Sequence, residues 1–326
     1  MNSFGRIFRI SIYGESHAGE LGVLIDGVPA GILLSEKDFE LAIERRKPNQ
    51  VGSTSRKEDD IPLIKSGVFN SYTTGAPILI SFENKNIKSE DYNFNGFYRP
   101  GHSDFVANKK YKSFNDFRGS GHFSGRMTLA LVAAGVVANK ILPDIKISAS
   151  VISVAGSKDF QTKIDEAEQN GDSLGAVVEC RINNLPVGYG EPFFDSLESV
   201  LAHLIFSIPG AKAIEFGNGI FAGSAKGSEF NDVFINENGE TKTNNSGGIN
   251  AGISNGNEIV FRVYFRPSAS ISKAQETFNF ETKKMGELKI QGRHDVCYAL
   301  RTPVIVESVA AIVLADFKLI LSSQKL

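Results

Sequence analysis

Two short segments of the chain group arginine, histidine and aspartate in a way that suits proton transfer on an anion. A guanidinium offers paired donors to a phosphate or carboxylate, and an imidazole moves a proton near neutral pH. Taken alone, each segment is equally well explained by an arginine paired with its own aspartate in a loop. The two segments are RPGHSD (Arg99, His102, Asp104) and GRHD (Arg293, His294, Asp295).

His17 is a third candidate for chemistry, because it stands in the glycine-bounded segment YGESHAGE directly after an alternating apolar run. The sequence leaves two interpretations open for it, a catalytic role or a solvated position in a loop. The histidines and aspartates of all three segments lack the HExxH or His-x-His spacing of a preformed ligand pair. No metal centre is therefore expected.

Glycine-rich runs are a second kind of candidate site. GSGHFSG (119–125) and GNGIFAG (217–223) read GxGxxxG and lack the GxGxxG spacing of the dinucleotide fingerprint. In GSAKGS (223–228), the lysine precedes the glycine, which is not the order of a Walker A loop. The sequence predicts neither kind of nucleotide loop.

Composition excludes several functional classes. The 35 basic and 37 acidic residues are interspersed and give a net charge of −2, so a nucleic-acid partner is not expected. Cys180 and Cys297 form no CxxC pair, which predicts no disulfide framework and suits a reducing cytoplasm. The N-terminus lacks signal-peptide features and the apolar stretch 304–315 contains Glu307, so neither a signal peptide nor a membrane span is expected.

Local patterns place these candidates on elements. The alternating segments 8–12 and 22–31 predict a hairpin that carries His17 in its connection. A helix is expected from the N-cap Ser35 to Pro48, with Arg46 in its last turn. A cation at that position is also explained by the helix macrodipole alone.

The segment 128–141 is helical in composition and apolar nearly all round, so it should be covered on both faces. Residues 176–182 and 258–267 are predicted strands, and the second presents Arg262, Tyr264 and Arg266 on a face that looks functional. Long polar connections at 84–98, 113–125 and 235–257 are expected as binding loops or lids. Hairpins separated by helices predict an α+β fold.

Ten segments in one order resemble the signature segments of the chorismate synthase family, from about residue 4 to residue 316. They are FGRIFRISIYGESHAGELGVLIDGVPAGI, ERRKPNQ, TTGAPI, FYRPGHSDF, DFRGSGHFSGRMT, AAG, AIEFGNGI, NSGGINAGISNG, FRPSASI and GRHDVC. The resemblance implies a single domain over residues 1–326, a β-α-β sandwich with central helices between antiparallel sheets.

The activity that this resemblance implies is a lyase reaction of the shikimate pathway. Phosphate is eliminated from 5-enolpyruvylshikimate 3-phosphate to give chorismate, with reduced FMN as cofactor and NADPH as an indirect reductant. A cytoplasmic homotetramer is implied as well. Two rival functions on the same scaffold are a non-catalytic anion-binding protein and a flavin-independent phosphatase.

The resemblance also assigns residues. Its catalytic positions are His17, which protonates the departing phosphate, His102, which protonates the flavin, and Asp295, which relays the substrate proton. The substrate-binding positions are Arg46, Arg99, Arg126 and Arg293, and Arg46 also matches an NADPH position. The FMN positions are His122, Phe123, Ser124, Ala251, Arg266, Pro267, Ser268, Ala269, Ser270 and Arg293. Where the family usually has Arg-Ser-Ser-Ala-Arg-Glu-Thr, this chain has HFSGRMT.

Overall fold

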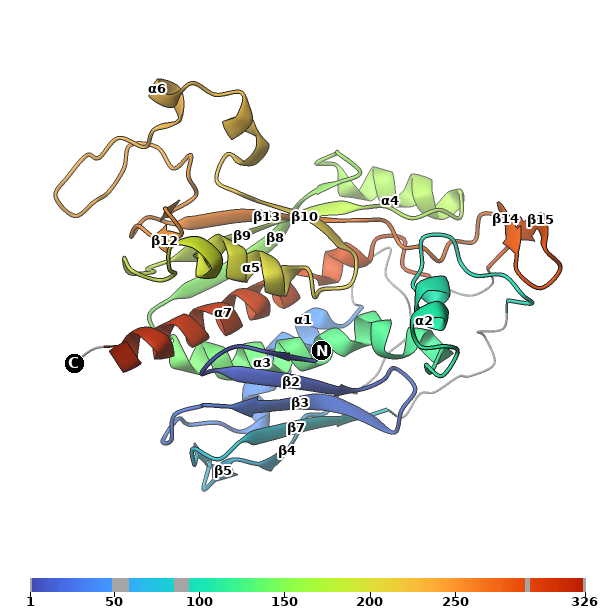
Figure 1. Cartoon of the computed structure of the whole chain (residues 1–326), viewed down its shortest axis with the longest axis horizontal. Helices are drawn as coiled ribbons and strands as arrows, with labels where there is room; N and C mark the ends of the chain where they lie inside the picture. The colour runs from blue at the N-terminus through green and yellow to red at the C-terminus, as the bar shows by residue number, and fades with distance from the viewer. Residues whose placement is uncertain (1, 49–58, 85–93, 291–293, 325–326) are drawn as a thin grey trace.

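Two antiparallel sheets lie on either side of a pair of buried helices in the computed structural model (Figure 1), which describes residues 2–48, 59–84, 94–290 and 294–324. The first sheet has the order β1 (Ser3–Phe4), β2 (Arg9–Gly14), β3 (Glu20–Asp26), β7 (Ile78–Glu83) and β4 (Leu63–Ser66). The second has the order β10 (Ala211–Phe216), β13 (Ile259–Phe265), β9 (Ala176–Asn183) and β8 (Lys146–Val154).

Short hairpins and helices complete the described part of the fold. The two-stranded hairpins are β5 (Val68–Phe69) with β6 (Tyr72–Thr73), β11 (Ile249–Asn250) with β12 (Ile253–Ser254), and β14 (Gln275–Asn279) with β15 (Lys284–Leu288). The α-helices are α1 (Glu40–Arg46), α2 (Asp104–Lys110), α3 (Thr128–Ile141), α4 (Phe160–Gln169), α5 (Leu197–Ile205), α6 (Gly227–Phe230) and α7 (Pro303–Gln324).

The predicted N-terminal hairpin is present, with β2 paired to β3 from Arg9–Asp26 to Gly14–Leu21. Alternation explains it, because Leu21, Val23 and Ile25 are fully buried on one face. The connection of five residues between the strands holds His17. The predicted helix 128–141 is α3, with the same bounds as expected.

α3 and α7 form the middle of the sandwich, and α3 packs on β3 while α7 packs on β8 and β9. A Cβ atom at Gly135 of α3 would lie 2.3 Å from the Cβ atom of Ser308 in α7, so the glycine permits the close approach. The two helices run in the same direction, and both begin at the end of the molecule that carries α2 and the β14–β15 hairpin (Figure 1). The apolar surface all round α3 is explained by these neighbours.

Two acidic residues inside the apolar helix α7 anchor other elements to it. Glu307 accepts two hydrogen bonds from Arg45, at 2.6 and 2.8 Å, and one of 2.7 Å from the backbone amide of Ala149 in the edge strand β8. Asp316 accepts the backbone amides of residues 6, 7 and 8 at 2.9, 2.7 and 2.9 Å. Within the described residues, no helix is long and apolar enough to span a membrane.

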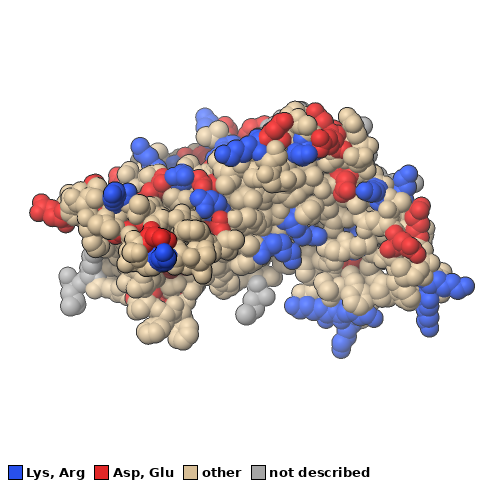
Figure 2. Space-filling view, turned by 90° about the horizontal axis from the view of Figure 1, so that it is seen from above, with Lys and Arg blue, Asp and Glu red and all other residues tan. Residues whose placement is uncertain are grey.

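Two of the three residues on the face expected to be functional in the 258–267 strand are paired with side chains of neighbouring strands. Arg262 is paired with Glu179 at 2.9 Å, and Tyr264 donates a 2.6 Å hydrogen bond to Glu215. Burial, together with that hydrogen bond, raises the pKa of Tyr264 to about 12. Arg262 and Tyr264 therefore connect β13 to its two neighbouring strands, β9 and β10. On the surface seen from above, acidic and basic side chains are interspersed (Figure 2).

Candidate active site

A cavity of about 470 Å³ opens where α3 and α7 begin. Ser124, Gly125 and Arg126 lead into α3 at the cavity wall, and Arg301 and Thr302 lead into α7. The first-turn N–H groups of a helix and its macrodipole favour a bound anion. Two parallel helices therefore direct their positive ends at the same space.

Asp60 is the acidic group between two buried arginines of this cavity. Its carboxylate oxygens lie 2.8 Å from Arg46 Nη2 and 2.9 Å from Arg126 Nη1, and all three side chains are at least nine-tenths buried. Burial lowers the pKa of Arg46, although Asp60 opposes that effect, and a guanidinium stays protonated in either case. Two cations thus share this carboxylate, and arginines outnumber carboxylates among the described residues that line the cavity.

His17 is buried behind the cavity wall, with only 3% of its surface exposed. A Cβ atom at Gly119, which lines the cavity, would lie 2.1 Å from His17 Cε1, so the imidazole sits directly behind that glycine. Asn84 holds the histidine loop through the carbonyls of residues 15 and 18 at 3.2 and 2.7 Å, and it also accepts a 2.6 Å bond from Arg126. The solvated alternative for His17 is therefore wrong.

His102 is held from both ring nitrogens. Nδ1 lies 2.6 Å from Asp104 Oδ1, and Nε2 lies 3.1 Å from Ser120 Oγ. Arg99 grips the same aspartate with bonds of 2.7 and 2.8 Å. Burial opposes ionisation of Asp104, but the hydrogen bonds from Arg99 and His102 prevail and hold its pKa well below the usual range. The carboxylate therefore stays charged and fixes the imidazole.

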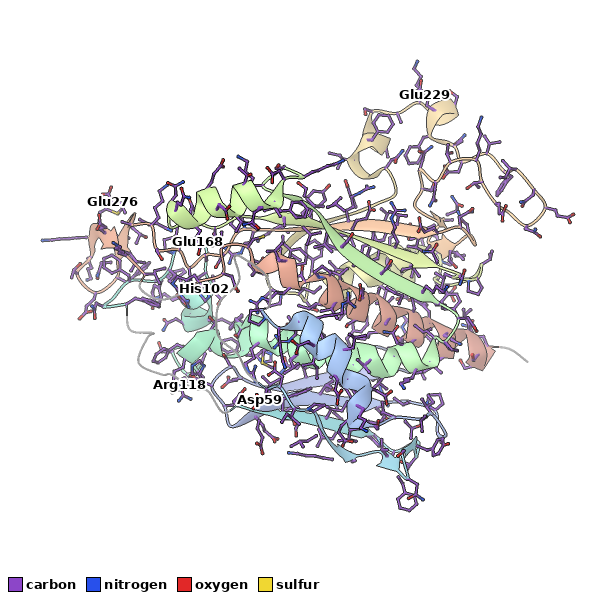
Figure 3. All side chains as sticks on the ribbon, turned by 180° about the vertical axis from the view of Figure 1, so that it is seen from behind. Asp59, His102, Arg118, Glu168, Glu229 and Glu276 are labelled. Carbon is purple, nitrogen blue, oxygen red and sulfur yellow. The ribbon has the colours of Figure 1, made fainter. Side chains whose placement is uncertain are left out.

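Arg99 is a structural partner as well as a residue of the cavity wall. Besides Asp104, it donates a 3.0 Å hydrogen bond from Nη1 to Ser270 Oγ. The pairing of an arginine with its own aspartate, which the sequence offered as the simple explanation of RPGHSD, is thus present within the site. Figure 3 labels His102, which lies at the level where α3 begins.

Asp295 lies on the cavity wall and is hydrogen-bonded to Arg301. Its neighbour His294 also lines the cavity. Arg293, assigned to both substrate and FMN, lies outside the described residues. The second arginine–histidine–aspartate segment therefore reaches the cavity, with Asp295 paired to an arginine six residues further along the chain.

Comparison with known proteins shows which family the chain belongs to. The family model described as chorismate synthase matches residues 8–319. The chain belongs to the chorismate synthase family. A chorismate synthase of Chitinophaga pinensis is 54% identical over 322 residues, covering 98% of this chain and 97% of the relative. One of Dehalococcoides mccartyi is 42% identical over 351 residues, covering 98% and 96%.

A solved structure described as a crystal structure of chorismate synthase superposes with a TM-score of 0.74. It is 26% identical and covers 96% of this chain and 92% of that chain. The α+β sandwich predicted from the resemblance is confirmed by the two sheets and the central helices.

Most FMN positions implied by the chorismate synthase resemblance meet at the cavity, and three do not line it in the described structure. The lining ones are Phe123, Ser124, Arg266, Ser268, Ala269 and Ser270. Pro267 lies behind them, near Gly175. His122 points elsewhere, to Gly14 O at 3.2 Å and Asn2 Oδ1 at 3.1 Å. Ala251 lies in the turn between β11 and β12.

Of the three long connections expected as binding loops or lids, two contribute residues to the cavity and one does not. Residues 113–125 supply Gly119, Ser120 and Phe123 to the cavity, and Phe94 is contributed by the connection 84–98. None of the described lining residues comes from 235–257. That stretch instead completes the projecting segment 217–246 and the β11–β12 hairpin. The expectation of a binding loop is therefore not supported there.

Sequence reasoning missed Asp60, Tyr298 and Arg301. Tyr298 and Arg301 stand three and six residues after Asp295. They are the first and last residues of a 3₁₀-helix, which aligns residues three apart, and both line the cavity together with Asp295. That spacing was a usable signal. Asp60 carried none, because its arginine partners are 14 and 66 residues away.

We predict that Asp60→Asn lowers the free energy of unfolding by about 3–5 kcal/mol, because it leaves two buried guanidinium groups without their carboxylate. Denaturant unfolding measures this effect. Added inorganic phosphate should raise the Tm of the variant more than that of the wild type, since an anion then replaces the lost charge. Asp26→Asn, which alters an exposed pair with Arg9, is the matched control. Equal stability of Asp60→Asn and wild type would contradict the prediction.

Proposed function

We propose that the protein catalyses elimination of phosphate from 5-enolpyruvylshikimate 3-phosphate to give chorismate, with reduced FMN. The observation that carries this proposal is the pair of Arg46, at the end of α1, and Arg126, just before α3, which share Asp60 in a chain of the chorismate synthase family. The substrate bears two carboxylates and a phosphate, and forked guanidinium donors suit both kinds of group. The excess positive charge beside Asp60 thus has a matching ligand.

The residues present fit a flavin. Within the described part of the chain, Arg46 Nε, Arg301 Nε and the Tyr298 hydroxyl are buried without a hydrogen-bond partner. Buried donors of this kind need an acceptor, and the cavity volume suits a cofactor or substrate. Residues 266–270 with Phe123 and Ser124 would hold the FMN. The chemistry that bound reduced FMN would supply is a transient transfer of electron density to the substrate, which would make the C–O bond easier to break.

In this proposal, each residue of the candidate site has one role in binding or in proton transfer. Arg46, Arg126 and the two helix N-termini bind the anionic groups. His17 gives a proton to the departing phosphate oxygen, and His102 donates toward the flavin. Asp295 takes part in relaying the substrate proton. The fixed partners of His102 and Asp295 orient them before substrate arrives, which is the condition for efficient general acid–base catalysis.

NADPH enters the proposal as an indirect reductant of the flavin. Arg46 matches the NADPH position by resemblance, but it is buried and bonded to Asp60. A cytoplasmic location is proposed because both cysteines are free and buried, as expected in a reducing compartment.

The proposed homotetramer has a candidate contact surface in residues 217–246, which project from the body between β10 and β11 (Figure 1). Asp232 organises this segment by accepting the amides of residues 245 and 246 at 2.7 and 2.9 Å. Phe234, Ile235 and Ile220 nevertheless remain 70, 60 and 89% exposed. Ordered backbone with exposed apolar side chains is typical of an interaction surface.

We expect sedimentation velocity to give the mass of four chains for the wild type, and a smaller species for Phe234→Asp. The physical reason is the cost of burying a charge without a partner at an apolar contact. Lys242→Asp on the same segment serves as a control for the charge change. A tetramer that persists in Phe234→Asp would remove this segment from the interface.

We predict that the anaerobic protein, given 5-enolpyruvylshikimate 3-phosphate and chemically reduced FMN, forms chorismate and phosphate in equal amounts. Chorismate absorbance and released phosphate are followed together, and oxidised FMN is the control, which should give neither product. Phosphate without chorismate would identify a hydrolase. Neither product, with tight anion binding, would identify a non-catalytic binding protein.

We predict that His102→Ala folds and binds FMN but loses about 10²- to 10⁴-fold in turnover, the usual contribution of a general acid or base. Turnover is measured in the same anaerobic assay and FMN binding by fluorescence titration. His203→Ala is the control, because that imidazole packs on Phe4 away from the cavity. Full turnover in His102→Ala would exclude the proposed role.

A further inference from the structure

The connection between α4 and β9, residues 171–175, lies behind two separate walls of the cavity. Ser173 Oγ donates a 2.7 Å hydrogen bond to the backbone carbonyl of Ser268. The next residue, Leu174, donates its backbone amide to Val296 O, also at 2.7 Å. Ser268 belongs to the segment proposed to hold FMN, and Val296 follows Asp295 directly. One short connection therefore contacts both the segment proposed to hold FMN and the residue that follows Asp295.

Burial and close packing give this connection little freedom. Ser173 is 8% exposed, and Lys273 N donates to Gly171 O at 2.9 Å at the far end of the same wall. A Cβ atom at Gly175 would lie 2.7 Å from Phe265 O and 3.4 Å from Pro267 Cδ. The backbone of 171–175 thus packs directly against the strand end that leads into residues 266–270.

The contact at Ser268 continues to His102 through a chain of hydrogen bonds. Ser270, two residues further, accepts the 3.0 Å hydrogen bond from Arg99. Arg99 in turn grips Asp104, which fixes the His102 imidazole. A shift of the 268–270 backbone would therefore be transmitted to His102, while a shift at Val296 would be transmitted to Asp295.

We infer that Ser173 is a positioning residue, which sets the separation between the Ser268–Ser270 wall and the Asp295 wall. It does not line the cavity and acts through the main chain of Ser268, while the next residue, Leu174, holds Val296 beside Asp295. The inference rests on the proposed function, because the value of a fixed separation is the geometry it gives to a ligand between the walls. Figure 3 labels Glu168, near the end of α4 from which this connection departs.

Ser173→Ala in the full chain tests the inference. Removing the hydroxyl takes away the donor that holds the partly buried Ser268 carbonyl, so we expect the Kd for FMN to rise by about tenfold. Hydrogen exchange of the ligand-free protein should become faster in residues 266–273. Ser173→Thr keeps the hydroxyl and should restore both readouts. Ser254→Ala is the matched control, because this buried serine donates to Pro186 O at 2.6 Å outside the cavity lining.

Three results would overturn the inference. They are an unchanged FMN affinity and exchange rate in Ser173→Ala, a failure of Ser173→Thr to restore them, and an equal loss of FMN affinity in Ser254→Ala, which would indicate a general loss of stability. Failure of the proposed function is recognised separately, since the wild type would then form no chorismate in the anaerobic assay. The exchange rates of residues 266–273 would still decide the role of Ser173.

Discussion

The close approach of α3 and α7 at Gly135 and Ser308 is the contact on which the rest of the structure depends. It lets the two helices lie side by side in the middle of the sandwich, with one sheet packed on each. Because the helices are parallel, their N-termini lie close together at the cavity. The cavity and its preference for anions follow from this arrangement.

Charge balance in that cavity explains why an anion is needed at all. Arg46 and Arg126 share Asp60, and Arg301 stands on the same wall bonded to Asp295. A buried cation is tolerated only with partners of opposite charge. Among the described residues that line the cavity, arginines outnumber carboxylates, so a substrate with several acidic groups would balance their charge.

The titratable groups of the candidate site are each fixed by a neighbouring residue. Asp104 and Ser120 hold His102, Arg301 holds Asp295, and Gly119 closes over His17. Arg99 shows that structural pairing and a place in the site are compatible, because the same guanidinium orients Asp104 and contacts Ser270. Preorganisation of this kind lowers the reorganisation required when ligands bind.

The sequence by itself determined the family, the hairpin around His17 and the bounds of α3, because ordered motifs and local periodicity carry that information. Tertiary structure alone decided that Asp60 joins Arg46 to Arg126, and that His122 turns toward Asn2 instead of the cavity. It also turned the polar face of β13 into ion pairs with β9 and β10. These contacts join residues that are far apart in the chain. Motif spacing within a segment therefore cannot predict which distant side chain will neutralise a buried charge.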